Sequence, residues 1–158
     1  MIIHPIPPLY GKDSKTLILG SFPSVKSREA EFFYGHPQNR FWSVIPLLYG
    51  TEKPTTVEEK KRLILENGLA LWDVIASCEI VGSSDSSISN VTANDLSVIL
   101  QNSKVDRIFV NGKTAEKYYN KYTYPITGIK AICLPSTSPA NAAWNLEKLV
   151  DAWKIIKE

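Results

Sequence analysis

Four short apolar runs, each followed by a polar turn, constrain the fold of this chain more than any other feature. They cover residues 16–20, 69–75, 107–110 and 130–134. Brief apolar runs of this kind are typical of strands that are buried on both faces of a parallel sheet. Segments with helical periodicity lie between and after the runs, and this alternation predicts an α/β fold with helices on both faces of the sheet.

Five segments have apolar residues at the three- and four-residue steps of a helix. They are residues 41–49, 57–66, 94–101, 114–122 and a last helix that begins near residue 139. Pro46 lies inside the first of these, where a proline can kink a helix. Ser138 is expected to cap the last helix, with Pro139 at its first helical position. The serine-rich stretch 82–89 is expected to be a loop.

Length and charge limit the class of protein. With 158 residues, 44% of them hydrophobic and 22% charged, the chain is expected to form one globular domain over residues 1–158. The net charge of +2 permits a nucleic-acid partner but does not require one. The sequence shows no run of about 18 apolar residues and no signal peptide, so we expect no membrane partner and a cytoplasmic or nucleoid-associated location. We predict a monomer.

The sequence lacks the residue patterns that bind metals or organic cofactors. Cys78 and Cys133 lie far apart and form no Cys-x-x-Cys pair. There is no glycine-rich dinucleotide fingerprint, no phosphate-loop lysine, and no cluster of histidines or paired carboxylates. The sequence therefore predicts neither a metal site nor a cofactor.

The loops that follow the four predicted strands contain the polar residues most suited to a site. They begin near Gly20, Asp73, Asn111 and Pro135. Because the carboxyl ends of parallel strands meet at one edge of a sheet, and ligands bind there, we expect these loops to converge. They hold hydroxyls, amides, aromatics and one acid, which is a poor set for metal-dependent hydrolysis.

Three segments carry motifs in a recognisable order. Residues 20–24 read Gly-Ser-Phe-Pro-Ser, residues 34–42 read Tyr-Gly-His-Pro-Gln-Asn-Arg-Phe-Trp, and residues 136–141 read Ser-Thr-Ser-Pro-Ala-Asn. Together they resemble the motifs of the uracil-DNA glycosylase superfamily, most closely those of its hypoxanthine (deoxyinosine) DNA glycosylase branch. The resemblance implies a three-layer α/β/α sandwich around a four-stranded parallel sheet, in agreement with the four strands predicted from the apolar runs.

The resemblance also implies a catalytic residue. In the hypoxanthine branch the catalytic role is associated with the asparagine of the His-Pro-x-Asn-Arg-Phe-Trp motif, which is Asn39 here. An alternative structural role for Asn39 is the cap of a helix that begins at Arg40. The first motif of the superfamily usually carries an aspartate or asparagine that acts on water. Gly20, Ser21 and Pro23 provide no such side chain, and they are expected to form a backbone pocket around the water.

Four further residues are expected to bind the base. By the resemblance, Tyr34 would stack on the extruded base, and such stacking contributes about 1–3 kcal/mol. Phe22, Asp73 and Asn111 are expected to lie in the same pocket. The Asp73 carboxylate could accept the N1–H of hypoxanthine or the N3–H of uracil, so it does not decide the base. A turn or capping partner to nearby backbone N–H groups is an equal alternative for Asp73.

The last motif is expected to contact DNA. Ser136, Thr137, Ser138 and Asn141 would approach the minor groove and its phosphates. Ser136 stands where uracil-specific members of the superfamily carry histidine or asparagine.

The function implied by the resemblance is that of a monofunctional DNA glycosylase. It would excise a deaminated base flipped out of DNA, hypoxanthine first and uracil second, and leave an abasic site. No lysine is placed as a Schiff-base nucleophile, so strand cleavage is not expected. The alternatives are a mismatch-specific uracil or thymine DNA glycosylase for G:U and G:T pairs, a module that binds damaged DNA without catalysis, and an α/β protein that binds a small nucleobase or nucleoside.

Overall fold

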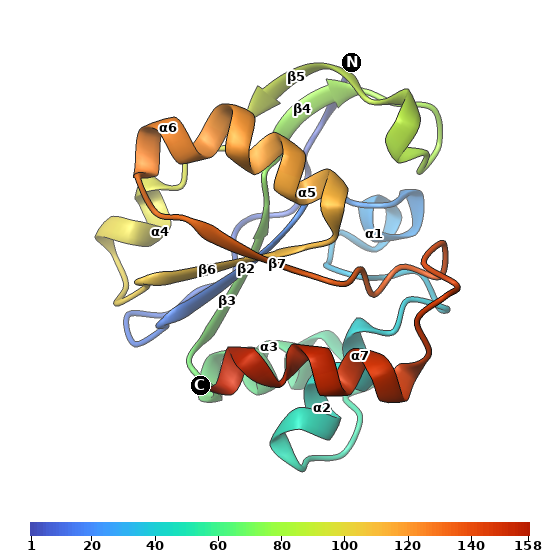
Figure 1. Ribbon diagram of the computed structural model, residues 1–158, viewed down its shortest axis with the longest axis vertical. Helices are drawn as coiled ribbons and strands as arrows, with labels where there is room; N and C mark the ends of the chain where they lie inside the picture. Colours follow the sequence, from blue (N-terminus) through green and yellow to red (C-terminus); the bar gives the residue numbers. More distant parts are fainter.

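The central sheet of the computed structural model, which describes residues 1–158, consists of four parallel strands (Figure 1). They are β2 (Thr16–Gly20), β3 (Leu69–Asp73), β6 (Arg107–Asn111) and β7 (Ala131–Leu134), in the spatial order β3-β2-β6-β7. Each strand overlaps one of the apolar runs, and β6 extends one residue beyond its run. Every residue of β2 is buried, because this strand lies between two others and is covered on both faces.

Helices cover both faces of this sheet, which confirms the predicted three-layer sandwich (Figure 1). One face packs against α2 (Phe41–Tyr49), α3 (Val57–Glu66) and α7 (Leu146–Trp153). The other face packs against α4 (Ser97–Gln101), α5 (Lys113–Tyr118) and α6 (Tyr124–Thr127). Ile18 of β2 belongs to the first apolar core and its neighbours Leu17 and Leu19 to the second, because successive side chains of a strand point to opposite faces.

The structure also contains a second, antiparallel sheet, which the apolar pattern of the sequence does not predict. It consists of β1 (Ile2–Ile3), β4 (Ile75–Glu79) and β5 (Ser89–Ala93). The predicted strand 69–75 is wrong at its end, because β3 stops at Asp73 and the chain turns after Val74 into β4. The predicted loop 82–89 also needs correction, since it contains the 3-10 turn η1 (Asp85–Ser87) and the first residue of β5.

The last helix, α7, begins at residue 146 and not near residue 139, which corrects the prediction for this segment. Its cap is Asn145, whose side-chain oxygen accepts a backbone N–H of the first turn at 2.8 Å. Residues 138–144 form turns and extended backbone instead. Ser138 therefore does not cap this helix, and the reason is the position of Arg40, described below.

The other helices differ from the prediction mainly at their ends. The helix α1 (Val25–Ala30) occupies part of the loop expected after the first strand. The helix α2 continues through Pro46 without interruption. The segment predicted at 114–122 is α5 followed by the π-helical turn η2 (Tyr119–Thr123), and the chain ends in the 3-10 turn η3 (Lys154–Lys157). None of these helices combines the length and the apolar character needed to cross a membrane.

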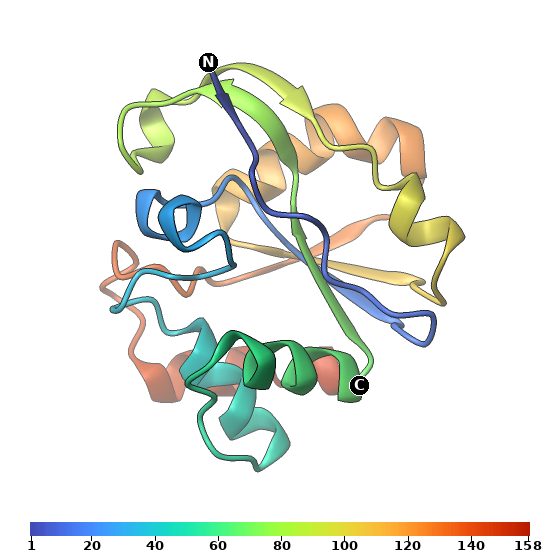
Figure 2. The same ribbon diagram turned by 180° about the vertical axis from the view of Figure 1, so that it is seen from behind.

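The N-terminal segment runs beside β4 and β3 (Figure 2). The strand β1 pairs with β4, and Leu9 forms an antiparallel bridge with Leu71 of β3. The residues between these two contacts therefore lie along the carboxyl end of β3. This arrangement places His4 next to Asp73.

Candidate active site

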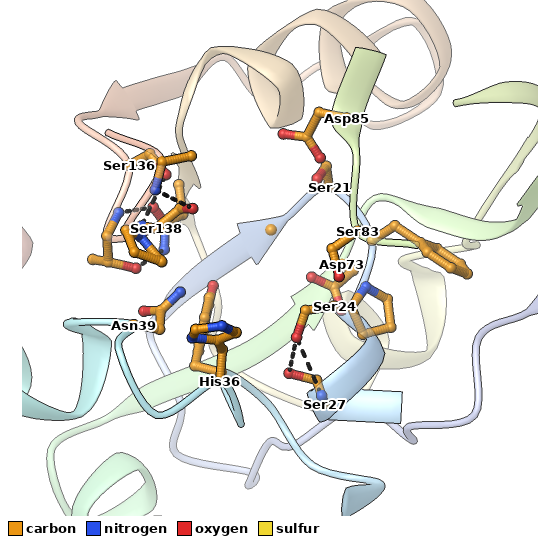
Figure 3. Close-up of a pocket in the computed structure, with 18 of the residues that line it drawn as sticks. Ser21, Ser24, Ser27, His36, Asn39, Asp73, Ser83, Asp85, Ser136 and Ser138 are labelled. Carbon is orange, nitrogen blue, oxygen red and sulfur yellow. Dashed lines mark hydrogen bonds between the residues drawn. The ribbon is translucent and has the colours of Figure 1, made fainter. Parts of the chain in front are cut away.

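A pocket of about 500 Å³ opens at the carboxyl ends of the parallel strands (Figure 3). The strand-end loops meet there, as a parallel sheet requires, together with the serine-rich segment around η1. The lining residues are Gly20, Ser21, Phe22, Pro23, Ser24, Ser27, Phe33, Tyr34, His36, Asn39, Asp73, Ile80, Ser83, Ser84, Asp85, Ser86, Asn111, Ser136, Thr137, Ser138, Pro139 and Ala140.

This pocket brings together all but one of the site residues expected from the sequence. Those that line it are Gly20, Ser21, Phe22, Pro23, Tyr34, Asn39, Asp73, Asn111, Ser136, Thr137 and Ser138. The exception is Asn141, whose side-chain amide donates to the backbone carbonyl of Ser136 at 3.0 Å. Asn141 therefore holds the shape of the last motif from outside the pocket.

Asn39 lies at one side of the pocket, beside His36 (Figure 3). Its Oδ1 accepts a hydrogen bond from Phe41 N at 2.9 Å, at the start of α2. Asn39 is not the N-cap of α2, which is Arg40, and no side chain caps the helix from that position. Asn39 satisfies the first N–H of the helix from one residue before the cap. The Asn39 Nδ2 group makes no hydrogen bond within the protein. The side chain can thus accept the hydrogen bond from Phe41 N and donate one to a molecule in the pocket at the same time.

Arg40 joins the second motif to the last one. Its guanidinium donates to the backbone carbonyls of Thr137, Ser138, Asn141 and Trp144, with Nη2 2.8 Å from Ser138 O and 3.1 Å from Asn141 O. No carboxylate forms an ion pair with Arg40, so carbonyl dipoles balance its charge. Because these carbonyls point at the guanidinium, residues 138–144 turn around it and do not continue as a helix.

Asn111 and Thr137 connect the ends of β6 and β7. Asn111 Nδ2 donates to Thr137 Oγ1 at 3.0 Å, and Asn111 Oδ1 accepts from Thr137 N at 3.1 Å. Thr137 is fully buried, and its contact with DNA stays a prediction. It holds the last motif in place, while Ser136 and Ser138 remain partly exposed.

Tyr34 forms part of the pocket wall in a left-handed backbone conformation, with φ 52°. Its ring stacks on Phe41, with centroids 4.0 Å apart and planes 17° apart, and Phe41 is fully buried. The Tyr34 hydroxyl is buried without a hydrogen-bond partner. Burial, and then the charge of Asp73, raise the pKa of Tyr34, so the phenol keeps its proton.

His4 is a site residue that no sequence motif marks. Its Nε2 lies 2.7 Å from Asp73 Oδ2, and the two side chains are only 4% and 7% exposed. The imidazole packs edge-on against Phe22 and Trp72, at centroid distances of 5.9 and 6.3 Å. The contact joins residues 69 positions apart, and only the pairing of the N-terminal segment with β3 and β4 creates it.

Asp85 is a second acidic residue of the pocket that the sequence did not reveal. It belongs to η1, and its carboxyl points toward Ser21 (Figure 3). Partial burial raises the pKa of this carboxyl, although the residue as a whole stays exposed. A hydrogen bond from Arg28 to the Gly82 carbonyl, at 3.0 Å, ties the segment to α1. No group of three or more histidine, cysteine, aspartate or glutamate side chains in the structure could hold a metal ion.

This chain is similar to known proteins over nearly its whole length, including the pocket residues. The family model of the Uracil DNA glycosylase superfamily matches residues 7–157. This chain belongs to the uracil-DNA glycosylase superfamily. Membership of that superfamily makes the chain a DNA glycosylase, an enzyme whose substrate is DNA, and it confirms the family predicted from the three motifs.

Individual members of the superfamily are similar to this chain over most of their length. A hypoxanthine DNA glycosylase from Methanosarcina acetivorans is 33% identical over 146 residues, which is 89% of each chain. A hypoxanthine DNA glycosylase from Methanosarcina barkeri is 27% identical over 114 residues, covering 71% of this chain and 72% of the relative. A solution NMR structure of a candidate uracil DNA glycosylase from Methanosarcina acetivorans has a TM-score of 0.80, with 28% identity over 99% of this chain and 100% of that one.

The absence of a side chain at Gly20 leaves room for the Asp73 carboxylate and the Tyr34 hydroxyl. A Cβ at this position would overlap Asp73 Oδ1 and would lie 3.4 Å from Tyr34 Oη. We expect Gly20→Ala to displace the carboxylate and to lower the single-turnover rate of base release about 100-fold, because a displacement of about 1 Å can cost that much. The melting temperature should change little, since Gly20 has ordinary strand backbone. Gly11→Ala is the control, because its Cβ would meet only ordinary contacts of 3.7 Å or more. A full rate in Gly20→Ala would contradict this role.

Proposed function

We propose that this DNA glycosylase hydrolyses the N-glycosidic bond of a deaminated base flipped out of DNA, hypoxanthine in the first place and uracil in the second. The observation that carries the proposal is the convergence of Asn39, Tyr34 and Asp73 on one pocket at the carboxyl ends of the strands. The two similar proteins named hypoxanthine DNA glycosylase support hypoxanthine as the preferred base.

Asn39 is the residue that we assign to the water. Cleavage of the bond builds positive charge on the sugar and negative charge on the leaving base, and a water must lie below the sugar. The Asn39 Nδ2 group is free to donate a hydrogen bond that holds this water, and Gly20, Ser21 and Pro23 shape the adjoining wall. An amide is a poor base, which suffices when bond breaking precedes water attack, because a cationic sugar needs little help from a strong nucleophile.

The aromatic residues of the pocket are proposed to hold the flipped base. Flipping costs a few kcal/mol, and least for a mismatched or damaged pair. Stacking on an aromatic ring contributes about 1–3 kcal/mol and offsets that cost. We assign the stacking to the face of Tyr34 opposite Phe41, with Phe22 and Asn111 completing the pocket around the base.

The DNA strand itself is proposed to bind along the last motif. Ser136 and Ser138 are partly exposed beside the pocket and would meet the minor groove and its phosphates, while Asn141 supports them. We further propose that the enzyme acts as a monomer in the cytoplasm, at or near the nucleoid.

The proposal is tested by single-turnover incubation with matched duplexes that carry one deoxyinosine or one deoxyuridine, followed by alkaline cleavage of abasic sites. We expect faster release of hypoxanthine than of uracil. Release of uracil or thymine only opposite guanine would favour a mismatch-specific enzyme. Tight binding of the lesion without any abasic product would favour a damage-binding module and would contradict the proposal.

The stacking role of Tyr34 gives a separate prediction. Tyr34→Ala should lower the rate about 10- to 100-fold, the equivalent of 1–3 kcal/mol of lost stacking. Tyr34→Phe should keep most of the rate, because its ring can still stack on Phe41, and should raise the free energy of unfolding by about 1 kcal/mol because it removes a buried hydroxyl without a partner. Urea denaturation measures the second effect, with Tyr122→Phe as the control outside the pocket. A full rate in Tyr34→Ala would exclude the stacking role.

A further inference from the structure

The Asp73 carboxylate is held so that one of its two oxygens faces the pocket. Oδ2 lies 2.7 Å from His4 Nε2. Oδ1 makes no hydrogen bond within the protein, and it lies against Gly20 at the pocket wall. The side chain is 7% exposed, so a molecule in the pocket would remove the last contact of Oδ1 with water. An ionised carboxylate can only accept hydrogen bonds, so the pocket presents an unpaired acceptor.

His4 is held as a hydrogen-bond donor. Ile6 N donates to His4 Nδ1 at 3.2 Å, and a ring nitrogen that accepts a hydrogen bond carries no proton. The proton of the imidazole therefore lies on Nε2, which donates to Asp73. Phe22 and Trp72 pack edge-on against the ring, and the two hydrogen bonds at its nitrogens fix its orientation. Any side chain at position 73 that remains in contact with His4 must turn an acceptor atom toward it.

We propose that His4 is the positioning residue that determines which atom of residue 73 the flipped base meets, so that the base-binding residue Asp73 presents an acceptor to a ring N–H of the base. The inference rests on the proposed function and adds to it a means of rejecting adenine and cytosine, the amino parents of hypoxanthine and uracil. Hypoxanthine carries N1–H and uracil carries N3–H at the edge opposite the sugar, and both hydrogens match Asp73 Oδ1.

Adenine and cytosine differ from these two bases at the same edge. Their corresponding ring nitrogen has a lone pair and no hydrogen, so it would face the lone pairs of Asp73 Oδ1. In a buried site neither group would find another partner, and a site built for a hydrogen bond rejects an analogue that cannot form it by several powers of ten. The pocket therefore selects the product of deamination against its amino parent.

The substitution Asp73→Asn separates this role from a general need for a polar group. The His4 Nε2–H still requires an acceptor, so the amide must turn its oxygen to His4 and its NH₂ group to the base. Two donors then face each other, and we expect hypoxanthine release to fall roughly 100-fold, since a hydrogen bond to a charged group contributes about 1.5–3 kcal/mol. In the double variant His4→Leu with Asp73→Asn the amide is free to turn its oxygen to the base. We expect this second change to recover about 10-fold of the rate.

The experiment measures single-turnover release from duplexes that carry deoxyinosine, deoxyuridine or 1-methyldeoxyinosine, whose base lacks the N1–H. The proteins are the wild type, Asp73→Asn, His4→Leu, the double variant and Asp106→Asn, a control at an exposed carboxylate outside the pocket. Thermal melting checks that each variant folds. The wild type should release hypoxanthine much faster than 1-methylhypoxanthine, and this ratio should shrink in Asp73→Asn. The ratio in the single variant gives an answer even where the double variant does not fold.

The two proposals fail in different ways. If the wild type releases neither hypoxanthine nor uracil, the proposed function is wrong. If the wild type releases hypoxanthine, but Asp73→Asn keeps the wild-type ratio between hypoxanthine and its 1-methyl analogue, Asp73 does not recognise the ring N–H. If a folded double variant is slower than Asp73→Asn alone, His4 supports the structure without orienting residue 73.

Discussion

Asn39→Ala is expected to lower the single-turnover release of hypoxanthine by about 100- to 1000-fold, the usual consequence of removing one preorganised donor from an active site. The Asn39 Nδ2 group has no partner in the protein, and its oxygen is held by Phe41 N, so the amide already points its donor into the pocket. The same variant also loses the hydrogen bond from Phe41 N, which contributes about 0.5–1.5 kcal/mol to the free energy of unfolding. Melting curves measured beside the kinetics show how much of the lost rate comes from unfolding.

Asn39→Asp separates catalysis from the hydrogen bond that residue 39 accepts from Phe41 N. A carboxylate still accepts the Phe41 N–H, and a negative charge at the start of a helix is favourable, so the fold should be at least as stable as in the wild type. The side chain no longer donates a hydrogen bond to the water, so the rate should stay close to that of Asn39→Ala. A rate in Asn39→Asp equal to or above the wild type would mean that residue 39 accepts a hydrogen bond from the water, contrary to our assignment.

Arg40→Met is expected to lower the free energy of unfolding by about 3 kcal/mol and the rate of base release by about 100-fold. The guanidinium contacts the carbonyls of residues 137, 138, 141 and 144. Hydrogen bonds to a charged group contribute about 1.5–3 kcal/mol each. Because these bonds are partly exposed to water, their total contribution is smaller than the sum of the four. Without them the last motif loses its position beside the pocket, and displacement of binding groups is costly for catalysis. Urea denaturation and single-turnover kinetics measure the two effects.

Arg40→Lys is the matched control, because it keeps the charge but not the planar fork that reaches several carbonyls. We expect it to recover less than half of the lost stability. Hydrogen exchange at the amides of residues 138–144 should rise in both variants, and more in Arg40→Met. Unchanged exchange and an unchanged denaturation midpoint in Arg40→Met would show that water replaces the guanidinium without loss.

The four parallel strands could be predicted because strands buried on both faces appear in a sequence as continuous apolar runs. The strand β2 is the plainest case, since all of its residues are buried. From the common direction of the strands it follows that their loops converge at one edge, and three motifs in these loops indicated the family. Periodicity and motifs are properties of short segments, so they can be recognised in the sequence without knowledge of the fold.

The second sheet could not be predicted in the same way. The strand β5 reads Ser-Asn-Val-Thr-Ala and is largely exposed, and β1 has two residues, so neither has an apolar pattern of its own. Each becomes a strand only because β4 offers it backbone partners. Pairing of this kind depends on the tertiary arrangement, which brings β1 and β5 beside β4.

The sequence by itself therefore determined the parallel sheet, the convergence of the loops, the family and half of the residues that line the pocket, because these depend on local periodicity and on motifs. Only the tertiary structure decided that Arg40 gathers carbonyls about a hundred positions away and prevents a helix at Pro139, and that His4 holds Asp73. Both outcomes are set by polar contacts between distant segments, whose energies compete with local helix and turn preferences and which no local pattern encodes.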